Sequence, residues 1–453
     1  MKIRFKMIIP VLLLAVFSCS QKAEEQKQGP PTSVVHPEWV KSATMYEVNI
    51  RQYTPEGTFN AFAAHLPRLR ELGVDILWLM PVHPIGEVNR KGSLGSYYSV
   101  KDYKGINPEF GNMDDFKTLV RMTHDMGMYM VIDWVPNHSS WDNPLIVEHP
   151  EWYEKDSAGN MFSPYDWTDV VQFDYDQQGL RDYMTETLKW WLDETGIDGF
   201  RFDVAHQIPI DYWNDLRPAL QETRADVLML AEAENRALHE KAFDITYAWE
   251  FHHLTNSVAK NEKNVNDLRE YLERWAEQYN ENDIRMYFTS NHDENSWNGT
   301  VRERLGPAAE VMAVLTYAVP GMPLIYSGQE AGLDHRLLFF EKDEIPWKDH
   351  PFTGLYTRLN DLKEQNPALW NPGFGGDLAE LPSDNPQRVL SFTRQTGESE
   401  VLFVLNLSQD DINVTISGLE DSDVFTDFSD NQTRTLQNPT FDLKGWEYKI
   451  FYR

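Results

Sequence analysis

The sequence predicts an α/β fold built around a (β/α)8 barrel, a TIM barrel, and three features of the chain predict it. From about residue 44 onward, short apolar segments alternate eight times with amphipathic helical patterns. The apolar segments are nearly continuous, as expected for parallel strands that are buried on both faces. The chain has 453 residues. A barrel of this kind needs roughly 250, so room is left for accessory domains.

The strand candidates share an apolar character and recur at intervals that leave room for a helix. They are Met45–Ile50, Asp75–Met80, Met128–Asp133, Gly196–Asp203, Val227–Ala231, Phe243–Trp249, Arg285–Thr289 and Pro323–Ser327. The helical patterns between and after them include Phe59–Leu72, Met113–Met126, Gly179–Glu194, Tyr212–Thr223, Val265–Tyr279, Pro307–Ala318 and Phe352–Gln365. The last helix is expected to end near Pro367, because proline cannot continue a helix.

Two segments depart from the barrel pattern. The connection after the third strand, about residues 138–178, is long and rich in proline, asparagine, aspartate and aromatic residues, which favours a short inserted B domain. After residue 372 the strand candidates become short and partly alternating, which indicates a C-terminal antiparallel β-sandwich domain over residues 373–453. Its strand candidates are Val389–Thr393, Val401–Leu407, Asn413–Ile416 and Trp446–Tyr452. The barrel is expected over residues 37–372.

The N-terminal segment has the composition of an export signal. Residues 1–18 begin with basic residues and continue with the short apolar run Met7–Phe17, which indicates a signal peptide. The only cysteine, Cys19, follows directly, so no disulfide can form within the chain. The stretch Val16–Cys19 resembles a bacterial lipobox, and polar residues up to 36 are typical of a flexible tether. We therefore expect an exported, membrane-anchored lipoprotein, at the outer membrane or surface of a Gram-negative-type bacterium; plain secretion is the alternative.

Composition limits the partners. The net charge of −30 argues against nucleic acid, because phosphates would be repelled. It says little about a neutral substrate. The chain also has 15 Trp and 20 Tyr, of which most are expected in the core and a few in a cleft as platforms for sugar rings.

Acidic residues stand at the carboxyl ends of four predicted strands. Asp133 ends the third and Asp203 the fourth, Glu232 follows the fifth, and Asp293 follows the seventh. Catalytic groups of such barrels lie at this end. Clustered carboxylates repel one another, so folding alone does not explain them. The pattern predicts a group of carboxylates at the barrel mouth that could serve acid–base chemistry.

Strand periodicity adds an arginine to this group. Gly199, Arg201 and Asp203 alternate by two and share the inward face of the fourth strand, whereas Phe200 and Phe202 face the helices. A guanidinium at this position can hold the Asp203 carboxylate ionised, as a nucleophile requires. A buried structural ion pair is the alternative.

At these positions the chain resembles the alpha-amylase family, glycoside hydrolase family 13. The resemblance covers nearly everything after residue 44, and the motifs occur in the family's order and spacing. They are Asp133 with Asn137 and His138, Gly199–Asp203, Glu232 after an apolar strand, Phe288 with Asn291–Asp293, Gln172–Tyr175 and Gly321–Gly328.

The resemblance implies a role for each matched residue. Asp203 would be the nucleophile, Glu232 the general acid/base and Asp293 the stabiliser of the transition state. Glu234 lies two residues after Glu232 and would point to the same side of an extended chain, so it is an alternative candidate for the general acid/base. Only the family's spacing from the strand favours Glu232. The side chains expected to contact the sugar at the point of cleavage are Tyr98, His138, Arg201 and His292; a structural role is the alternative for the tyrosine and the histidines.

The resemblance also implies a calcium ion between the barrel and the insertion. Asn137 and Asp174 match two of the ligand positions and offer oxygen atoms suited to a hard cation. Capping and turn formation are the alternative roles for both residues. No organic cofactor is implied. His206 and Gln207 stand where many members of the family have lysine and histidine, which departs from the usual pattern on the leaving-group side.

The expected activity is retaining hydrolysis of α-1,4-glucosidic bonds in starch or maltodextrins. Asp203 and Glu232 would lie on neighbouring strands, and retaining enzymes hold their carboxyls about 5–5.5 Å apart. Burial and nearby negative charge are expected to raise the pKa of Glu232. A glucanotransferase on the same scaffold is one alternative, and a non-catalytic surface glycan-binding protein is another. The sequence does not decide whether the enzyme cleaves within a glucan chain or at its ends, or whether it also cleaves α-1,6 bonds.

Overall fold

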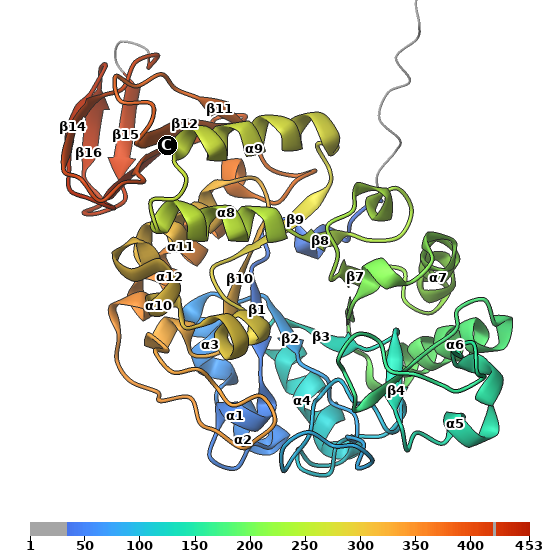
Figure 1. The fold of residues 1–453 in the computed structure, drawn as a ribbon. Coiled ribbons are helices and arrows are strands. Elements are labelled where there is room, and N and C mark those ends of the chain that lie inside the picture. Colours follow the sequence, from blue (N-terminus) through green and yellow to red (C-terminus); the bar gives the residue numbers. More distant parts are fainter. Residues whose placement is uncertain (1–33, 420–422) are drawn as a thin grey trace, which may run out of the picture. The chain divides into compact units, whose positions relative to one another are not determined.

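The computed structural model describes residues 34–419 and 423–453 and contains a closed barrel of parallel strands (Figure 1). Around the ring the strands follow the order β1, β2, β3, β6, β7, β8, β9 and β10. Their bounds are β1 (Met45–Val48), β2 (Ile76–Leu79), β3 (Tyr129–Trp134), β6 (Gly199–Phe202), β7 (Leu228–Ala231), β8 (Ile245–Tyr247), β9 (Ile284–Phe288) and β10 (Met322–Tyr326). The predicted (β/α)8 barrel is confirmed. The predicted signal peptide and Cys19 lie outside the described residues.

Helices surround the barrel on its outer side (Figure 1). They are α1 (Ile50–Tyr53), α2 (Phe59–Ala63), α3 (Leu66–Leu72), α4 (Met113–Asp125), α6 (Gln178–Thr195), α7 (Ile210–Thr223), α8 (Trp249–Ala259), α9 (Val265–Gln278), α10 (Val301–Leu305), α11 (Ala309–Ala318) and α12 (Pro351–Gln365). No helix in the described ranges has both the length and the apolar character that crossing a membrane requires.

Several elements differ from the sequence prediction, and α8 is not among the helical patterns that it named. The expected helix Phe59–Leu72 is divided into α2 and α3, with His65 at the N-cap of α3 and Gly73, at φ 86°, ending it. The expected strand Phe243–Trp249 is shorter, because α8 begins at Trp249. Other boundaries follow local signals: Asn112 and Asp115 form a capping box that starts α4.

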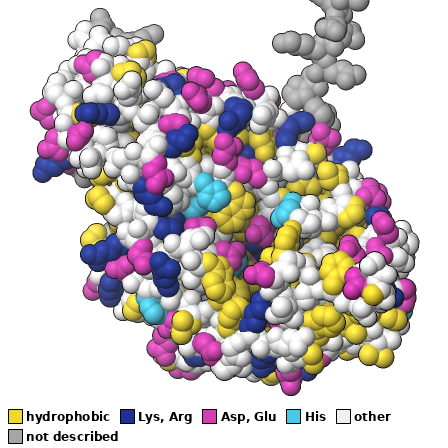
Figure 2. All heavy atoms as spheres, viewed as in Figure 1, with side chains coloured by type: hydrophobic (Ala, Val, Ile, Leu, Met, Phe, Trp, Pro, Cys, Tyr) yellow, Lys and Arg dark blue, Asp and Glu magenta, His cyan; other side chains and the backbone are white. Residues whose placement is uncertain are grey.

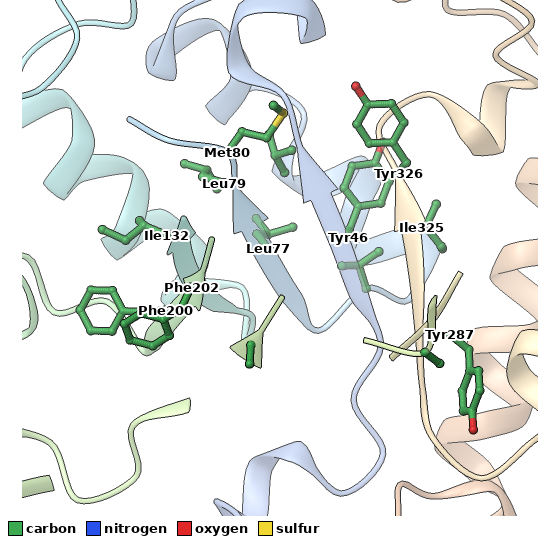
Figure 3. Packing of buried hydrophobic residues seen from close by; sticks show 14 of the residues in the cluster. Tyr46, Leu77, Leu79, Met80, Ile132, Phe200, Phe202, Tyr287, Ile325 and Tyr326 are labelled. Carbon is green, nitrogen blue, oxygen red and sulfur yellow. The ribbon is translucent and has the colours of Figure 1, made fainter. Parts of the chain in front are cut away.

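Strand side chains divide between two cores, as the alternation predicts. Figure 3 shows side chains of the larger core. Tyr46, Leu77, Phe200 and Phe202 belong to the large core between the strands and the helices. The intervening side chains fill the barrel interior; they are Met45, Ile76, Trp78, Val131, Leu228, Leu230, Ile245, Tyr247, Ile284, Met286, Phe288, Met322 and Leu324. Polar side chains that replace this apolar filling on the inward face therefore stand out at the carboxyl ends of the strands.

The connection after β3 contains a small two-stranded sheet. β4 (His138–Ser140) pairs antiparallel with β5 (Val170–Gln172), and His138 lies opposite Gln172. The short helix α5 (Leu145–Glu148) lies between them in the sequence. This segment holds the His138 side chain beside the carboxyl ends of the barrel strands.

The C-terminal residues form an antiparallel β-sandwich, as predicted. One sheet has the order β11, β12, β13, β18, β15, β16, and β14 pairs with β17 in a second. The strands are β11 (Asp377–Glu380), β12 (Val389–Thr396), β13 (Ser399–Asn406), β14 (Ile412–Thr415), β15 (Asp423–Asp427), β16 (Thr433–Leu436), β17 (Thr440–Leu443) and β18 (Tyr448–Tyr452). Both sheets contribute to one apolar core, for example through Leu402 and Val414. The sequence prediction missed β11, β15, β16 and β17; the residues of β11, β16 and β17 are mostly exposed.

Candidate active site

A cavity of about 500 Å³ opens at the carboxyl ends of the barrel strands. Asp203 after β6, Glu232 after β7 and Asp293 after β9 all line it. Tyr98 and His138 enter from the connections after β2 and β3. Figure 2 shows acidic and histidine side chains among hydrophobic ones near the centre of the drawn face.

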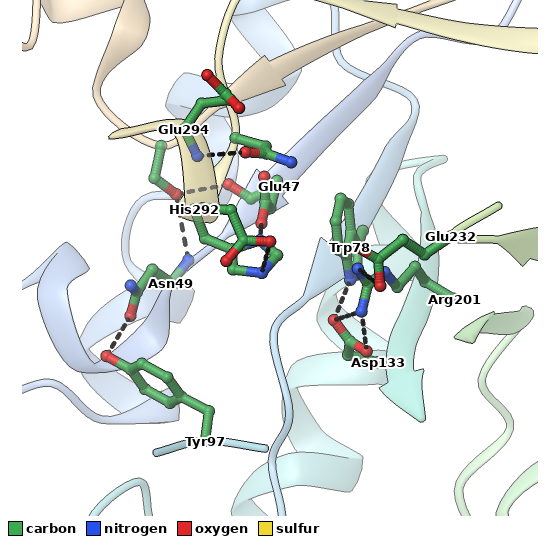
Figure 4. Close-up of polar contacts among 12 residues, drawn as sticks. Glu47, Asn49, Trp78, Tyr97, Asp133, Arg201, Glu232, His292 and Glu294 are labelled. Atoms are coloured by element: carbon green, nitrogen blue, oxygen red, sulfur yellow. Dashed lines mark hydrogen bonds and ion pairs between the residues drawn. The ribbon is translucent and has the colours of Figure 1, made fainter. Parts of the chain in front are cut away.

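One arginine faces three carboxylates at the base of this cavity, and Figure 4 labels two of them, Asp133 and Glu232. Arg201 is completely buried. Its Nη1 lies 2.9 Å from Asp133 Oδ1 and 3.0 Å from Asp203 Oδ1. Its Nη2 lies 2.9 Å from Glu232 Oε2. The inward orientation predicted for Arg201 and Asp203 is confirmed. The guanidinium contacts three carboxylates, whereas the predicted ion pair involved Asp203 alone.

The pairing of β6 with β7 brings Asp203 and Glu232 together. Phe202 lies opposite Ala231, and Glu232 N donates to Phe202 O over 3.0 Å. The two acids therefore leave neighbouring strands at the same level, and such strands lie about 4.8 Å apart. Between them Val204 N donates to Glu232 Oε2 over 2.8 Å. Val204 has φ 46°, a left-handed backbone that costs a β-branched residue on the order of 1–3 kcal/mol.

His292 forms a second group of polar contacts in the site, with Glu47, Tyr98 and Asp293. Its Nδ1 lies 2.5 Å from Glu47 Oε1, and its Nε2 lies 2.9 Å from the Tyr98 hydroxyl and 3.3 Å from Asp293 Oδ2. The Tyr98 hydroxyl donates to Asp133 Oδ2 over 3.0 Å. Burial alone would lower the pKa of His292, but the carboxylates of Asp293 and Glu47 outweigh it and raise this pKa to about 9. At neutral pH the imidazole is therefore a cation.

The protonation order of the two central acids differs from the sequence expectation. Burial and then the charge of Glu232 raise the pKa of Asp203 well above its usual range, although Arg201 opposes them. Burial also raises the pKa of Glu232, but Arg201 and the Val204 N–H outweigh it and hold this pKa below its ordinary value. In the substrate-free site the pKa of Glu232 is therefore shifted downward and not upward as expected, whereas the pKa of Asp203 is shifted upward. The reason is that the guanidinium faces Glu232 as well as Asp203.

The remaining predicted side chains lie as follows. His138 lines the cavity with its ring centroid 5.5 Å from that of Trp167, and burial lowers its pKa to about 3, so it is neutral. The rival acid Glu234 forms an ion pair with Arg285 and accepts from Glu250 N at the start of α8 over 2.9 Å, outside the cavity lining. The structure thus brings together the predicted catalytic and sugar-contacting residues and separates Glu234 from them.

The family model for the alpha-amylase catalytic domain matches residues 23–167 and 146–379, well over half of the chain. The chain belongs to the alpha-amylase family. Two curated relatives of it are alpha-amylase MalA of Haloarcula japonica and an alpha-1,4-glucan:maltose-1-phosphate maltosyltransferase of Streptomyces coelicolor. The first is 28% identical over 86% of this chain and 59% of its own length. The second is 28% identical over 78% of this chain and 56% of its own length. The chain thus spans less than two thirds of either relative.

Two solved structures are similar over nearly their whole length. The maltogenic alpha-amylase AmyB of Thermotoga neapolitana has a TM-score of 0.83 and 29% identity, over 91% of this chain and 98% of that one. An alpha-amylase of Lactobacillus plantarum has a TM-score of 0.82 and 29% identity, over 91% of this chain and 99% of that one.

The two candidate calcium ligands of this alpha-amylase-family chain have other partners in the structure. Asn137 Oδ1 accepts from Gln172 Nε2 over 2.8 Å. The two carboxylate oxygens of Asp174 accept from Asp176 N and Gln177 Nε2. Within residues 34–419 and 423–453, no three His, Cys, Asp or Glu side chains form a group that could hold a metal. These hydrogen bonds fit capping and turn formation. Calcium stays a prediction.

Sequence reasoning missed several residues of the site. Glu47 is fully buried on the inward face of β1. It lies two residues after Met45, which fills the barrel interior, so strand alternation could have predicted its inward orientation. Phe339 and Phe340 line the cavity from the loop after β10, and Trp297 lines it from a short π-helix (Glu294–Asn298) after β9. Only the run of apolar residues just before Glu341, in a segment otherwise polar, could have pointed to the phenylalanines.

Proposed function

We propose that this alpha-amylase-family chain is a retaining glycoside hydrolase that cleaves α-1,4-glucosidic bonds in starch-like polymers or maltodextrins. The observation that carries this proposal is the placement of Asp203 and Glu232 on adjacent strands around one buried guanidinium. Retaining enzymes need their two carboxyls about 5–5.5 Å apart, and neighbouring strands supply that spacing. The names of two relatives, both alpha-amylases, support the substrate class.

In the proposed first step, an Asp203 oxygen attacks the anomeric carbon while Glu232 gives its proton to the departing glycosidic oxygen. The carbon–oxygen bond to the leaving sugar breaks, and a covalent glycosyl ester forms. In the second step Glu232 takes a proton from water, whose oxygen attacks the same carbon and releases Asp203. Two inversions leave the product in the α configuration. Asp293 and the charged His292 lie where they can hold sugar hydroxyls during both steps.

The substrate has to change the proton distribution before this can happen. In the substrate-free site Arg201 and Val204 hold Glu232 ionised, whereas burial favours the protonated form of Asp203. A glycosidic oxygen beside Glu232 accepts a hydrogen bond only from the protonated acid, and hydrogen bonding to one form favours that form. We propose that a bound sugar moves the proton from Asp203 to Glu232, and so prepares nucleophile and acid together.

A glucanotransferase is the second candidate, because curated relatives include alpha-1,4-glucan:maltose-1-phosphate maltosyltransferases. The first step is the same, and the difference is whether water or a sugar hydroxyl attacks the ester. With a maltodextrin as the only substrate, release of one reducing end for each bond broken supports hydrolysis. Redistribution of chain lengths without new reducing ends supports transfer.

The first prediction is stereochemical. Proton NMR during early cleavage of maltoheptaitol, which has no reducing end of its own, should show the α anomer of the new reducing ends first and the β anomer only after mutarotation. Asp203→Asn should abolish turnover and keep the fold, since an amide cannot form the ester. Asp211→Asn, an exposed change at the start of α7, is the control and should remain active. Initial accumulation of the β anomer would overturn the mechanism and the role of Asp203.

A further inference from the structure

We propose that the cleft is closed at the end that receives the retained sugars, so that the enzyme removes short oligosaccharides from non-reducing chain ends. This inference rests on the proposed function, because it uses the roles of Asp203 and Glu232 to decide which end is which. It concerns the choice between internal and terminal attack, which neither the motifs nor the two carboxylates decide.

The barrel topology shows where the retained sugars lie. Glu232 gives its proton to the departing oxygen, so the leaving part of the glucan extends toward β7. In the closed ring β7 is the fourth strand from β1 in either direction, directly across the barrel. The retained sugars therefore extend from Asp203 toward the rim around β1. Tyr98, which follows the neighbouring strand β2, lines the cavity on that side.

Three loops meet on this side of the rim, and we call them the glycone-end collar. They are residues 86–95 after β2, residues 164–170 of the insertion after β3, and residues 337–343 after β10. Strands β2 and β10 both pair with β1. The collar therefore spans the rim opposite Glu232, from the insertion on one flank of β1 to the β10 loop on the other.

The central loop is bonded to the loop on its insertion side through a lysine. Lys91 Nζ lies 3.3 Å from Asp169 Oδ1 and donates to Asp166 O over 3.3 Å. Asp169 is almost fully buried, so its carboxylate is held in place. All three residues line the cavity, which places this joint at the cavity wall and not on the outer surface.

The same loop is bonded to the β10 loop on its other side. Leu94 N donates to Phe340 O over 3.1 Å, and Ser93 N donates to Glu341 Oε1 over 2.9 Å. The Ser93 hydroxyl also bonds the same carboxylate. At Gly92, with φ 64°, a Cβ would lie 2.5 Å from Phe340 Cβ, so the two backbones approach closely. The three loops thus form a continuous wall.

Residues that directly follow β1 fix this wall to the barrel. Arg51 in α1 is buried, and its Nη1 donates to Gly95 O over 3.0 Å. Gln52 Nε2 donates to both Leu338 O and Glu341 O over 2.9 Å. Buried side-chain donors that bind loop carbonyls restrict loop opening, because each opening would leave polar groups unpaired. The collar is therefore a fixed part of the site.

Aromatic rings lead from the reacting sugar to the collar. The Tyr98 and Phe339 rings are nearly parallel, with planes 14° apart and centroids 6.2 Å apart. Phe339 then contacts Trp297, with centroids 5.2 Å apart. Such faces suit successive sugar rings, and Phe340 and Lys91 of the collar line the same cavity. A chain end fits into this space, whereas the interior of a longer chain would have to pass through the bonded loops.

The experiment compares two heptasaccharides. One is maltoheptaose with a free non-reducing end, and the other carries a 4,6-O-benzylidene group on that end. The wild-type kcat/KM should be at least about tenfold lower for the blocked substrate, because this ratio measures the difference in transition-state binding. Early products from the free substrate should be short and uniform. Equal kcat/KM values for both substrates would overturn the proposal.

A collar variant tests whether these loops cause the difference. Lys91→Ala with Ser93→Ala and Glu341→Ala removes the side-chain contacts of both joints. It should raise the blocked-to-free ratio of kcat/KM severalfold or more. Glu87→Ala is the matched control: it lies on the same loop, its ion pair with Lys101 points away from the cavity, and it should leave the ratio unchanged. A collar variant with the wild-type ratio contradicts the proposal. If Asp203→Asn still cleaves free maltoheptaose, the proposed function fails instead.

Discussion

At the scale of single residues, the position of Arg201 decides the state of the site. A guanidinium that faces three carboxylates can keep only some of them ionised, because clustered acids compete for one positive charge. Asp133 illustrates the competition: burial raises its pKa to about 6 although Arg201 opposes this. The cluster therefore shifts the pKa values of its acids upward where burial outweighs Arg201, as at Asp133 and Asp203.

The role of Glu232 gives a prediction at this scale. Glu232→Gln should lower kcat on maltodextrins by about 10²–10⁴, the usual contribution of a general acid. It should have a much smaller effect on bond cleavage for an aryl glycoside whose leaving group needs no proton, and azide should restore turnover. Kinetics with maltoheptaose and a dinitrophenyl maltoside check both.

Glu234→Gln is the matched control, two residues away and bonded to Arg285 outside the cavity. It should keep the wild-type dependence on the leaving group. If Glu234→Gln loses that dependence and Glu232→Gln keeps it, the acid has been assigned to the wrong residue.

At the scale of elements, buried ion pairs fix the outer helices and the N-terminal segment to the barrel. Asp244, just before β8, is fully buried and accepts from both Arg217 Nη atoms of α7, at 2.8 and 3.1 Å. It also accepts from Met229 N of β7, and His36 Nδ1 lies 3.0 Å away. One carboxylate thus connects α7, β7 and the start of β8 with His36, which is 208 positions away in the sequence.

This carboxylate gives a prediction for stability. Asp244→Asn should lower the free energy of unfolding by about 3–5 kcal/mol at neutral pH, because Arg217 loses its buried partner. Burial would raise the pKa of Asp244, but Arg217 and His36 outweigh it and lower this pKa to about 2. A depressed folded-state pKa stabilises above the unfolded value of about 3.9 and loses that contribution as pH falls toward 2.

Urea unfolding of wild type and variant should therefore show a constant difference from about pH 7 to 5 and a smaller one near pH 3. Glu222→Gln is the control on the same helix, since it removes only the exposed Glu222–Lys189 pair. It should change stability by less than about 1 kcal/mol. A difference for Asp244→Asn that grows as the pH falls would contradict the argument.

The insertion after β3 carries the calcium prediction. If an ion binds Asn137 and Asp174, excess chelator should lower the melting temperature, because a ligand of the folded state stabilises it by mass action. Added calcium should restore the value and magnesium should not. An unchanged melting curve, with no metal found by elemental analysis, would favour the capping and turn roles that the hydrogen bonds of both side chains suggest.

At the scale of the whole molecule, the barrel supplies the chemistry and its loops supply the selection. The carboxylates lie on the strands that the barrel closes into one rim, so their positions follow from the common fold. The collar consists of connections, which vary freely without disturbing the core. Chain-end selectivity is therefore a property that loops add to the catalytic geometry of the barrel.

The location of the protein is also a property of the whole molecule. We propose that Cys19 is lipidated, on the basis of the lipobox-like stretch Val16–Cys19 and the polar residues after it. The wild-type protein should then sediment with membranes, and Cys19→Ala should release it into the soluble fraction. Ser20→Ala is the control and should leave the distribution unchanged. A wild-type protein found only in the culture medium would refute the anchor.

The sequence by itself determined the barrel and most of the catalytic group, and the reason is local. Strand periodicity is a property of consecutive residues, so the amino-acid order alone places Arg201 and Asp203 on one inward face. Motif order then added Glu232, Asp293, Tyr98 and the two histidines. The C-terminal sandwich was recognisable, although exposed polar strands such as β11 carry no apolar alternation and were missed.

Only the tertiary structure decided the properties that depend on distance between remote segments. The pKa order of Asp203 and Glu232 depends on which acids Arg201 reaches, and this follows from the packing of β3, β6 and β7. The charge on His292 depends on Glu47, 245 positions away. The closed end of the cleft depends on bonds among three loops, one of them Ser93 to Glu341 across 248 positions. Residue type and spacing determine which side chains a strand directs toward the barrel interior. The pKa values of those side chains and the contacts between loops depend on which remote segments the fold brings next to them.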